Sequence, residues 1–319
     1  MADLLILGGT GFVGSHLAAR LARDGHRLTI PSREPFRHAA LRVLPTVRLL
    51  RADVHHAATL DALCADADAV INLVGILNED GSNGLGFRRA HTELARRVVD
   101  ACRKRGVPRL LHMSALNADA AKGASYYLRS KGEAEGIVLT QCGPDLKATV
   151  FQPSLIFGPG DGATRRFAAL LELVPLVFPL ACPDARFAPV FVGDVVEAFA
   201  RALDDRATYG QRYQLCGPEV MTLAALVRAV GAARGRRTRI WRLPEPLARF
   251  QALVLGGRWV PADLRFTADN LRSLSVASVC SVDGFGRLGI QPRTLASQLP
   301  GYLGDGDPRA RYPLLRARR

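Results

Sequence analysis

The sequence predicts an α/β protein with a doubly wound parallel sheet and a smaller C-terminal lobe. Three observations support this fold class. Short apolar runs alternate with helical patterns from residue 3 to residue 151, as in a parallel sheet covered by helices on both faces. A cluster of glycines separates the first apolar run from the first helical segment. The composition, 48% hydrophobic and 23% charged, is that of a globular chain and not of a disordered one.

Local patterns place the elements of this first region in order. Apolar runs bounded by turn residues predict strands at 3–7, 27–30, 48–51, 69–74, 109–113 and 147–151. Between them, apolar residues at helical spacing predict helices at 13–23, 57–65, 87–105 and 126–140. Gly25 and Gly106 follow two of these helices, where a glycine commonly closes a helix.

The pattern changes after Phe151, where prolines recur and residues 158–162 form a turn cluster. Residues 191–203 resume a strand-to-helix pattern, and residues 221–233 predict a further helix. These changes define the predicted domains. The first domain takes 1–157, with 187–217 returning to it, the smaller substrate lobe takes 158–186 and 218–303, and 304–319 form an arginine-rich tail.

Charge limits the classes of function. The formal net charge is +14 with a sequence pI near 10.3, and most of the basic residues are arginines. We interpret it mainly as dispersed, solvated charge. We expect no nucleic-acid binding, because the sequence has neither zinc-finger spacing nor an aromatic-rich basic motif. For the arginine-rich tail, contact with acidic lipid or with a partner stays an open alternative.

The six cysteines form no C-x-x-C pair and no cluster with metal-ligand spacing, which predicts no metal site. We expect them to be reduced thiols of a cytoplasmic protein. The opening apolar run is too short for a secretory signal, and no apolar window reaches the roughly 18 residues of a membrane span.

The glycine cluster Gly8-Gly9-Thr10-Gly11-Phe12-Val13-Gly14 opens the first predicted helix. Its spacing, Gly8-x-x-Gly11-x-x-Gly14, provides a tight turn, a bare backbone and a close helix–strand contact, beside a helix N-terminus that favours phosphate. We therefore predict that the loop binds a dinucleotide through Gly8, Thr10, Gly11, Phe12, Val13 and Gly14.

This spacing resembles that of the short-chain dehydrogenase/reductase superfamily, in its extended or atypical branch, whose domain has the Rossmann fold. In such folds NAD enzymes place an acid after the second strand to hold the ribose 2′-hydroxyl. Here Ser32 and Arg33 come first, and a guanidinium can bind a 2′-phosphate through two hydrogen bonds. Ser32, Arg33 and Arg37 therefore favour NADP(H) over NAD(H), although Glu34 leaves NAD(H) open.

The resemblance implies two further cofactor contacts. Asp53 and Val54 follow the third strand, where superfamily members contact the adenine with a side chain and the backbone. Leu73, Val74 and Gly75 end the fourth strand, where the backbone passes beside the cofactor riboses.

Tyr127 and Lys131 stand four residues apart on one face of a predicted helix. An ammonium beside a phenol stabilises the phenolate and lowers its pKa, so that the tyrosine exchanges protons near neutral pH. The same lysine can donate a hydrogen bond to the nicotinamide ribose. The spacing therefore predicts a catalytic pair.

The third catalytic group is ambiguous. Superfamily enzymes end the preceding strand with a hydroxyl that polarises the substrate carbonyl. Aligning the strand ends puts Ala115 at this position, which we favour, whereas counting back from Tyr127 makes Ser114 the hydroxyl. His91 stands where extended members often carry an asparagine that supports a proton-relay water, and we interpret it as a structural histidine.

Longer segments narrow the resemblance. Residues 112–118 (HMSALNA), 127–135 (YLRSKGEAE), 151–161 (FQPSLIFGPGD) and 299–303 (LPGYL) resemble the Rossmann-type accessory subunit of mitochondrial respiratory complex I and its bacterial relatives. This resemblance implies a tightly held NADPH and proximity to a membrane or to a quinone enzyme. It also places Gln152, Pro153 and Ile156 on the nicotinamide side. The apolar run 167–178 would line the substrate cleft or face a quinone-like ligand or bilayer, although we favour a helix packed on the core.

Three functions remain open at this point. The first is an NADP(H)-dependent oxidoreductase on a small or lipophilic substrate of unknown identity, with Tyr127, Lys131 and Ser114 as its catalytic residues. The second is a non-catalytic NADPH-binding protein with a structural or sensory role, which Ala115 favours. The third is a sugar-nucleotide epimerase or dehydratase. The sequence leaves a monomer and a homodimer equally open.

Overall fold

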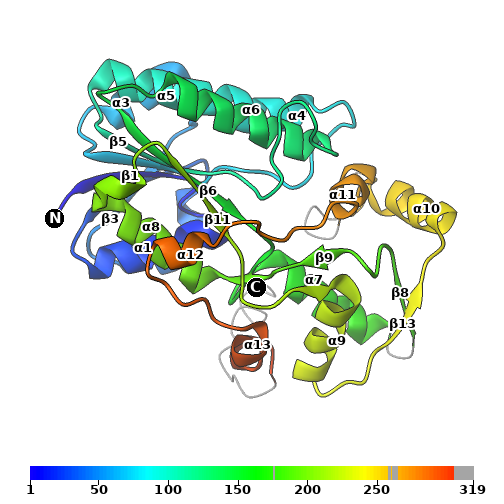
Figure 1. Ribbon diagram of the computed structural model, residues 1–319. Coiled ribbons are helices and arrows are strands. Elements are labelled where there is room, and N and C mark those ends of the chain that lie inside the picture. Colours follow the sequence, from blue (N-terminus) through cyan, green and yellow to red (C-terminus); the bar gives the residue numbers. More distant parts are fainter. Residues whose placement is uncertain (175–176, 258–259, 261–264, 305–319) are drawn as a thin grey trace. The chain divides into compact units, whose positions relative to one another are not determined.

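The computed structural model describes residues 1–174, 177–257, 260 and 265–304 (Figure 1). The chain packs into two compact units. Unit 1 contains residues 1–153, 192–215 and 280–291, and unit 2 contains 154–191, 216–279 and the chain from residue 292. Compared with the predicted domains, unit 2 starts at residue 154. Residues 280–291 join unit 1 because helix α12 (Gly284–Arg287) packs against strand β11 (Gln211–Leu215).

Unit 1 is built on a seven-stranded sheet with the order β11-β6-β5-β4-β1-β2-β3, in which all neighbours are parallel. Its other strands are β1 (Asp3–Leu7), β2 (Arg27–Ser32), β3 (Val47–Arg51), β4 (Ala69–Asn72), β5 (Arg109–Met113) and β6 (Lys147–Pro153). The predicted doubly wound parallel sheet is therefore confirmed. The strand order reverses at β1, so the carboxyl ends of β1 and β4 flank the crevice where such sheets bind ligands.

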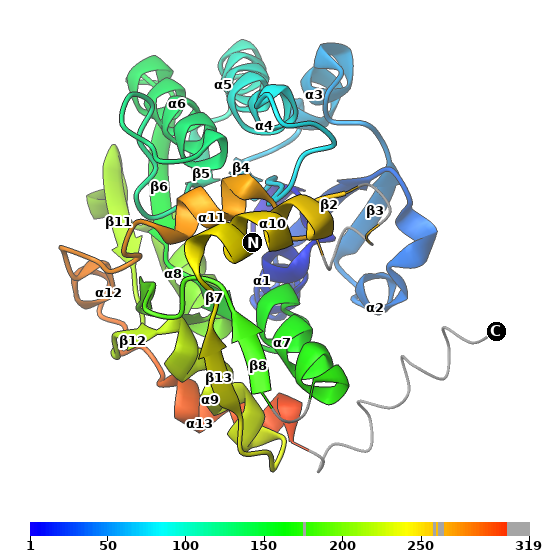
Figure 2. The same cartoon turned by 90° about the vertical axis from the view of Figure 1, so that its right-hand side faces the viewer.

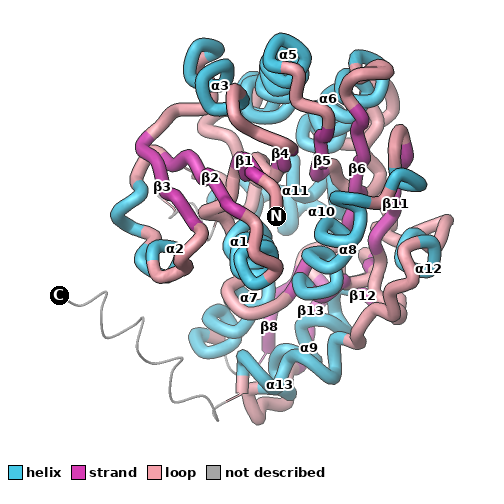
Figure 3. Tube along the Cα trace, turned by 90° about the vertical axis from the view of Figure 1, so that its left-hand side faces the viewer, coloured by secondary structure: helices cyan, strands magenta, loops and turns pink. Residues whose placement is uncertain are grey.

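Helices cover both faces of this sheet (Figures 1 and 3). One face carries α3 (Ala57–Cys64), α4 (Leu85–Arg88), α5 (Leu94–Arg105) and α6 (Tyr126–Gln141), and the other carries α1 (Phe12–Arg23) and α8 (Val192–Asp204). Helix α2 (Ala39–Arg42) and the 3-10 turns Pro35–Arg37 and Arg206–Thr208 complete the unit. The central strands are buried on both faces, as parallel strands between helical layers must be.

The predicted helix at 87–105 is interrupted. Residues Arg89–Glu93 form a π-helical turn between α4 and α5, and buried His91 lies within it. A π turn inserts an extra residue into the helical repeat and is often found at functional sites. The predicted helix is therefore present but contains a π turn that its apolar pattern did not reveal.

A buried arginine ties α8 to the sheet. Arg109, only 5% exposed, donates hydrogen bonds to the carbonyl oxygens of Ala202 and Leu203, to that of Lys147, and to the hydroxyls of Thr149 and Thr208. Burial lowers its pKa to about 10. The guanidinium is thus stabilised by carbonyls at the C-terminal end of a helix, where a cation is favoured.

Unit 2 consists of helices and three two-stranded ribbons (Figure 2). The ribbons pair β7 (Ile156–Phe157) with β10 (Val190–Phe191), β9 (Arg186–Phe187) with β12 (Met221–Thr222), and β8 (Val177–Leu180) with β13 (Arg239–Arg242). The helices are α7 (Gly162–Leu173), α9 (Leu223–Ala233), α10 (Glu245–Leu255), α11 (Ala268–Leu274) and α13 (Leu295–Leu303). A separate apolar core joins α7, α9 and α13.

Two expectations need correction. The apolar run 167–178 is not one helix, since α7 ends at Leu173 and Phe178 lies in β8, with 175–176 outside the described residues. Its members Phe167 and Phe178 pack in the core of unit 2. The expectation of six reduced cysteines is also wrong. Cys216 and Cys280 are each disulfide-bonded, whereas the other four are free thiols.

Within the described ranges, no helix is long and apolar enough to cross a membrane. The same residues contain no group of three or more His, Cys, Asp or Glu side chains that could hold a metal ion. Residues 305–319 of the predicted tail lie outside the described part of the chain.

Candidate functional site

The glycine loop joins β1 to α1 at the carboxyl edge of the sheet. Gly8 adopts a φ of 77°, and a Cβ there would lie 3.0 Å from the backbone of Leu73 and Val74. A Cβ on Gly14 would lie 2.3 Å from the carbonyl oxygen of Gly8, so α1 can approach the loop only through a glycine. Gly11 is exposed, and it begins α1 without a side-chain cap. The loop therefore leaves a bare helix N-terminus, as a pyrophosphate requires.

Thr10, Phe12 and Val13 belong to the same loop and first helical turn. That turn contains no acidic side chain, so nothing there opposes an anion. The predicted loop residues are thus brought together at one end of α1.

The end of β2 presents a basic side chain to solvent. Ser32 is buried, and its hydroxyl accepts a hydrogen bond from the backbone N–H of Glu34 at 3.2 Å. The Glu34 carboxylate pairs with Arg37 at 2.8 Å, and both are exposed. Arg33 is exposed as well and makes no ion pair with any described residue. Of the two predicted arginines, Arg33 is therefore the one whose charge is not already neutralised.

Asp53 lies beyond the end of β3. Its carboxylate accepts a hydrogen bond from the backbone N–H of His55 at 2.9 Å, which, with the nearby charges of His55, His56 and Arg33, lowers the pKa of Asp53. Asp53 is therefore an ionised acceptor at neutral pH. Val54, beside it, packs against the core of unit 1.

The segment after β4 passes directly over the buried lysine. Leu73 continues the sheet by donating its N–H to the carbonyl of Leu7 at 2.9 Å. The N–H of Val74 bonds the side chain of Asn72 at 3.1 Å. A Cβ on Gly75 would lie 3.0 Å from Lys131 Nζ, so this exposed glycine lets the backbone approach the ammonium group.

Lys131 is 4% exposed and lies between two strand ends. Its Nζ donates to the carbonyl oxygens of Met113 at 3.1 Å and Val74 at 3.5 Å. Burial lowers the pKa of Lys131 to about 8. The ammonium is held by backbone oxygens of β5 and of the segment after β4, in a position fixed by the sheet.

Tyr127 is half-buried, with its ring 5.6 Å from the His91 ring and 6.0 Å from Phe87. Burial raises the pKa of Tyr127 to about 12. The expected lowering of this pKa by Lys131 is not found, because the ammonium is directed to the strand-end carbonyls. In this form of the protein the phenol therefore keeps its proton.

Ser114 and Ala115 follow β5. Ser114 is 2% exposed, and its Oγ has no hydrogen-bond partner in the described structure. Ala115 is also buried and carries no hydroxyl. A buried hydroxyl without a partner is unfavourable, so Ser114 rather than Ala115 keeps an unused polar group at the end of β5.

Two buried histidines, His91 and His112, lie near enough to Lys131 for its charge to affect their pKa values. His91 Nε2 accepts from the backbone N–H of Ile76 at 3.1 Å, so its Nδ1 donates to Ser130 Oγ at 2.8 Å. Burial, then the charge of Lys131, lowers the pKa of His91 to about 2 and that of His112 to about 3. Both rings are neutral, and His91 connects the segment after β4 to α6 as a structural residue.

The residues predicted to lie on the nicotinamide side, Gln152, Pro153 and Ile156, do not all belong to the same unit. The side-chain amide of Gln152 donates to both carboxylate oxygens of Glu135 at 3.0 and 2.9 Å, and Glu135 also pairs with Arg212 at 2.5 Å. Gln152 therefore has only its amide oxygen left for a cofactor. Pro153 ends β6 in unit 1, whereas Ile156 begins β7 in unit 2.

Sequence reasoning missed the polar residues that support Lys131. Asn72 donates to His112 Nδ1 at 3.3 Å, which leaves the proton on Nε2, and that atom has no described partner. Ser130, one residue before Lys131, links His91 to the Tyr127 carbonyl at 2.9 Å. The signal in the sequence was a polar residue in an otherwise apolar run, Asn72 at the end of β4 and His112 one residue before the end of β5.

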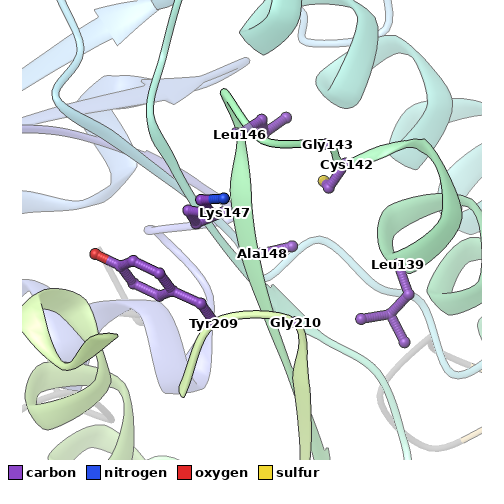
Figure 4. Close-up of a pocket in the computed structure, with 8 residues that line it drawn as sticks. All are labelled: Leu139, Cys142, Gly143, Leu146, Lys147, Ala148, Tyr209 and Gly210. Atoms are coloured by element: carbon purple, nitrogen blue, oxygen red, sulfur yellow. The ribbon is translucent and has the colours of Figure 1, made fainter. Parts of the chain in front are cut away.

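A pocket of about 210 Å³ lies away from this site (Figure 4). It is lined by residues at the end of α6, the start of β6 and the turn before β11, namely Leu139, Cys142, Gly143, Leu146, Lys147, Ala148, Tyr209 and Gly210. Because Lys147 begins β6 and Pro153 ends it, the pocket and the predicted site lie at opposite edges of the sheet.

Comparisons with known proteins show which proteins this chain is similar to. The model of the NAD dependent epimerase/dehydratase family matches residues 4–216. The chain is 27% identical over 316 residues to the mitochondrial NADH-ubiquinone oxidoreductase 40 kDa subunit of Neurospora crassa, covering 97% of this chain and 80% of that protein. It is 30% identical over 251 residues to the ceramide reductase of Caulobacter vibrioides, covering 76% and 73%.

Among solved structures, the enzyme WbmF of Bordetella bronchiseptica in complex with NAD+ superposes with a TM-score of 0.72. The identity is 18%, and the match covers 99% of this chain and 94% of that one, so it supports the fold. Together these matches confirm the resemblance to the superfamily and to the respiratory accessory subunit that the sequence motifs indicated.

Proposed function

This chain belongs to the NAD dependent epimerase/dehydratase family, and from that premise we propose that it is an oxidoreductase that binds NADP(H) and acts on a small or lipophilic, quinone-like substrate. One observation carries the proposal. The Lys131 ammonium is buried between the carbonyls of Met113 and Val74, and nearby Ser114 at the end of β5 keeps a buried hydroxyl without a partner. A buried ammonium beside a buried hydroxyl without a partner is typical of a functional site.

The residues of unit 1 fit a dinucleotide. The bare N-terminus of α1 at Gly11 suits the pyrophosphate, and Asp53 can accept hydrogen bonds from the adenosine part. Arg33, with no ion pair among the described residues, suits a 2′-phosphate, while the Glu34 carboxylate is engaged by Arg37. When bound, NADP(H) supplies or accepts the hydride.

The side chains then divide the remaining work. Ser114 donates a hydrogen bond to the substrate oxygen and polarises its carbonyl. Tyr127 Oη holds a proton at neutral pH, since its pKa is about 12, and so can donate it to that oxygen. Lys131, with a pKa of about 8, stays largely charged at pH 7 and would hold the nicotinamide ribose by donating a hydrogen bond to it.

The cofactor part is tested by purifying the protein without added nucleotide, denaturing it and identifying any released dinucleotide by mass spectrometry. We expect stoichiometric NADPH. Release of NAD(H) instead would contradict the role of Arg33 and move Glu34 into ribose binding.

The catalytic part is tested with a matched pair of variants. Tyr127→Phe removes the proton donor and should abolish turnover, whereas Tyr126→Phe makes the same change one residue earlier, at an exposed side chain, and should keep it. Equal turnover in the two variants would contradict the proposal.

A second candidate is a non-catalytic NADPH-binding protein with a structural or sensory role. The raised pKa of Tyr127 and the methyl group of Ala115 favour it. Bound nucleotide would then act by stabilising unit 1 through mass action. Under this reading Tyr127→Phe leaves nucleotide binding and any cellular phenotype unchanged. A sugar-nucleotide epimerase or dehydratase would need the same strand-end hydroxyl, which Ser114 and not Ala115 carries.

We also propose where the protein acts. Similarity to a subunit named for NADH-ubiquinone oxidoreductase supports peripheral contact with a membrane or a quinone enzyme. The cytoplasmic location and the monomer or homodimer stay predictions from the sequence. Flotation of the purified protein with lipid vesicles tests the membrane contact, and light scattering tests the oligomeric state.

A further inference from the structure

Helix α10 of unit 2 exposes its large apolar side chains. Leu247, Phe250, Leu253 and Val254 are 45%, 62%, 74% and 40% exposed. The side chains that α10 buries are small, since Ala248 and Ala252 are 5% and 2% exposed. We call the four exposed residues the α10 face.

This arrangement is the reverse of that in an ordinary surface helix. With 3.6 residues per turn, the α10 face spans roughly 120° of the helix, and the two alanines lie on the opposite side. A helix of a water-soluble domain turns its large apolar residues inward. The α10 face is therefore built for contact with an apolar phase outside unit 2.

The ribbon that leads into α10 also exposes large apolar side chains. Trp241 of β13 is 52% exposed and lies two residues after exposed Arg239, so the two share one face of the strand. Arg239 pairs in register with Val177 of β8, which is 46% exposed. In Figure 1, α10 and the β8–β13 ribbon border the same side of unit 2, and Figure 2 shows both from that side.

The same segment is strongly basic. Residues 234–249 contain six arginines and one glutamate. Three of the arginines pair with carboxylates, namely Arg234, Arg242 and Arg249. Arg237 and Arg239 are exposed and make no ion pair with any described residue. An apolar helix face beside tryptophan and free arginine has the chemistry of a segment that lies in the interface of an anionic bilayer.

We propose that the α10 face and Trp241 dock unit 2 on the surface of an anionic lipid bilayer, with Phe250 and Leu253 entering the headgroup boundary and Arg237 and Arg239 binding lipid phosphates. The proposal deepens the membrane contact proposed above and depends on it, but not on the identity of the nucleotide. The charge of the surrounding segment favours this occupant over a protein partner, because the arginines match phosphate and the apolar face needs no complementary shape.

The experiment measures binding of the full chain to vesicles of phosphatidylcholine alone and of equal parts phosphatidylcholine and phosphatidylglycerol. The test variant is Phe250→Asp with Leu253→Asp, at two exposed positions. The control is Phe36→Asp, the same change at a phenylalanine of unit 1 that is 78% exposed. We expect wild type and control to bind the anionic vesicles, and the test variant to bind at least about tenfold more weakly. At high salt, which screens the arginines, wild type should retain part of its binding and the test variant none.

Three results would overturn the proposal. Equal vesicle binding of wild type and the test variant would assign the membrane contact to another surface, and the peripheral location would survive. Absence of wild-type binding would remove the membrane contact together with the α10 docking. If the test variant had a lower molar mass than wild type in light scattering but the same vesicle binding, the occupant of the α10 face would be a second copy of this chain. Circular dichroism shows that each variant is folded.

Discussion

The two buried histidines make the stability of unit 1 depend on pH. Burial and neighbouring positive charge lower the pKa of His91 to about 2 and that of His112 to about 3. In the unfolded chain each ring takes up a proton near pH 6.5. Below that pH the unfolded state therefore binds more protons than the native state, and the free energy of unfolding falls as the pH falls.

The magnitude follows from the size of these shifts. Each histidine lowers the free energy of unfolding by about 1.4 kcal/mol per pH unit below 6.5, until the pH approaches its native pKa. Together they should remove about 2.7 kcal/mol between pH 7.5 and pH 5.5. This is a large part of the roughly 5–15 kcal/mol by which domains are stable.

Urea unfolding followed by circular dichroism at several pH values measures this slope, and hydrogen exchange of β5 shows that unit 1 is the part that unfolds. His112→Gln keeps an acceptor for Asn72 but cannot titrate, so we expect it to remove about half of the slope. His56→Gln is the control, because the His56 side chain is 74% exposed. If His112→Gln left the slope unchanged, the assignment of the acid sensitivity to buried neutral histidines would be wrong.

Three further predictions concern the cofactor loop and the lysine. Because burial sets the pKa of Lys131 at about 8, NADPH affinity in a fluorescence titration should weaken as the pH rises above 8, and Lys131→Gln should flatten this profile. Arg33→Ala should weaken NADPH by about tenfold to a hundredfold in calorimetry and leave NADH unchanged, while Glu34→Ala should not weaken NADPH. Loss of NADH affinity in Arg33→Ala would contradict 2′-phosphate recognition. Gly14→Ala should prevent stable folding, since its Cβ would lie 2.3 Å from a carbonyl oxygen. The control is Gly136→Ala in α6, where a Cβ would have nothing within 4 Å. It should raise the free energy of unfolding measured in thermal melts by about 0.5–1 kcal/mol.

The parts of the molecule that were predictable from sequence are those that local chemistry determines. The glycine spacing predicted the turn at Gly8 and the close contact at Gly14, because only glycine permits both. The alternation of strands and helices likewise predicted the parallel sheet of unit 1. The spacing of Tyr127 and Lys131 placed them on one helix face.

Tertiary contacts determine what the sequence did not reveal. The pKa of Tyr127 depends on the partners of the Lys131 ammonium. That ammonium donates to strand-end carbonyl oxygens, and burial raises the pKa of Tyr127. The choice between Ser114 and Ala115 depends on which buried group lacks a partner, which a residue pattern does not record. The α10 helix escaped prediction because its segment is mixed in composition and interrupted by prolines, and the exposure of its apolar side depends on tertiary packing.

The discontinuity of unit 1 has a consequence for its synthesis. Arg109 is bonded to the carbonyl oxygens of Ala202 and Leu203, which lie 93 and 94 residues further along the chain. A ribosome that has reached residue 153 has made β5 and β6 but neither α8 nor β11. The nascent sheet then ends in an unpaired β6 edge, with the Arg109 guanidinium still in water. Residues 154–191 of unit 2 must emerge before unit 1 can be completed, so the two units mature in overlapping order, and a gene fragment that stops at residue 153 encodes an unfinished sheet.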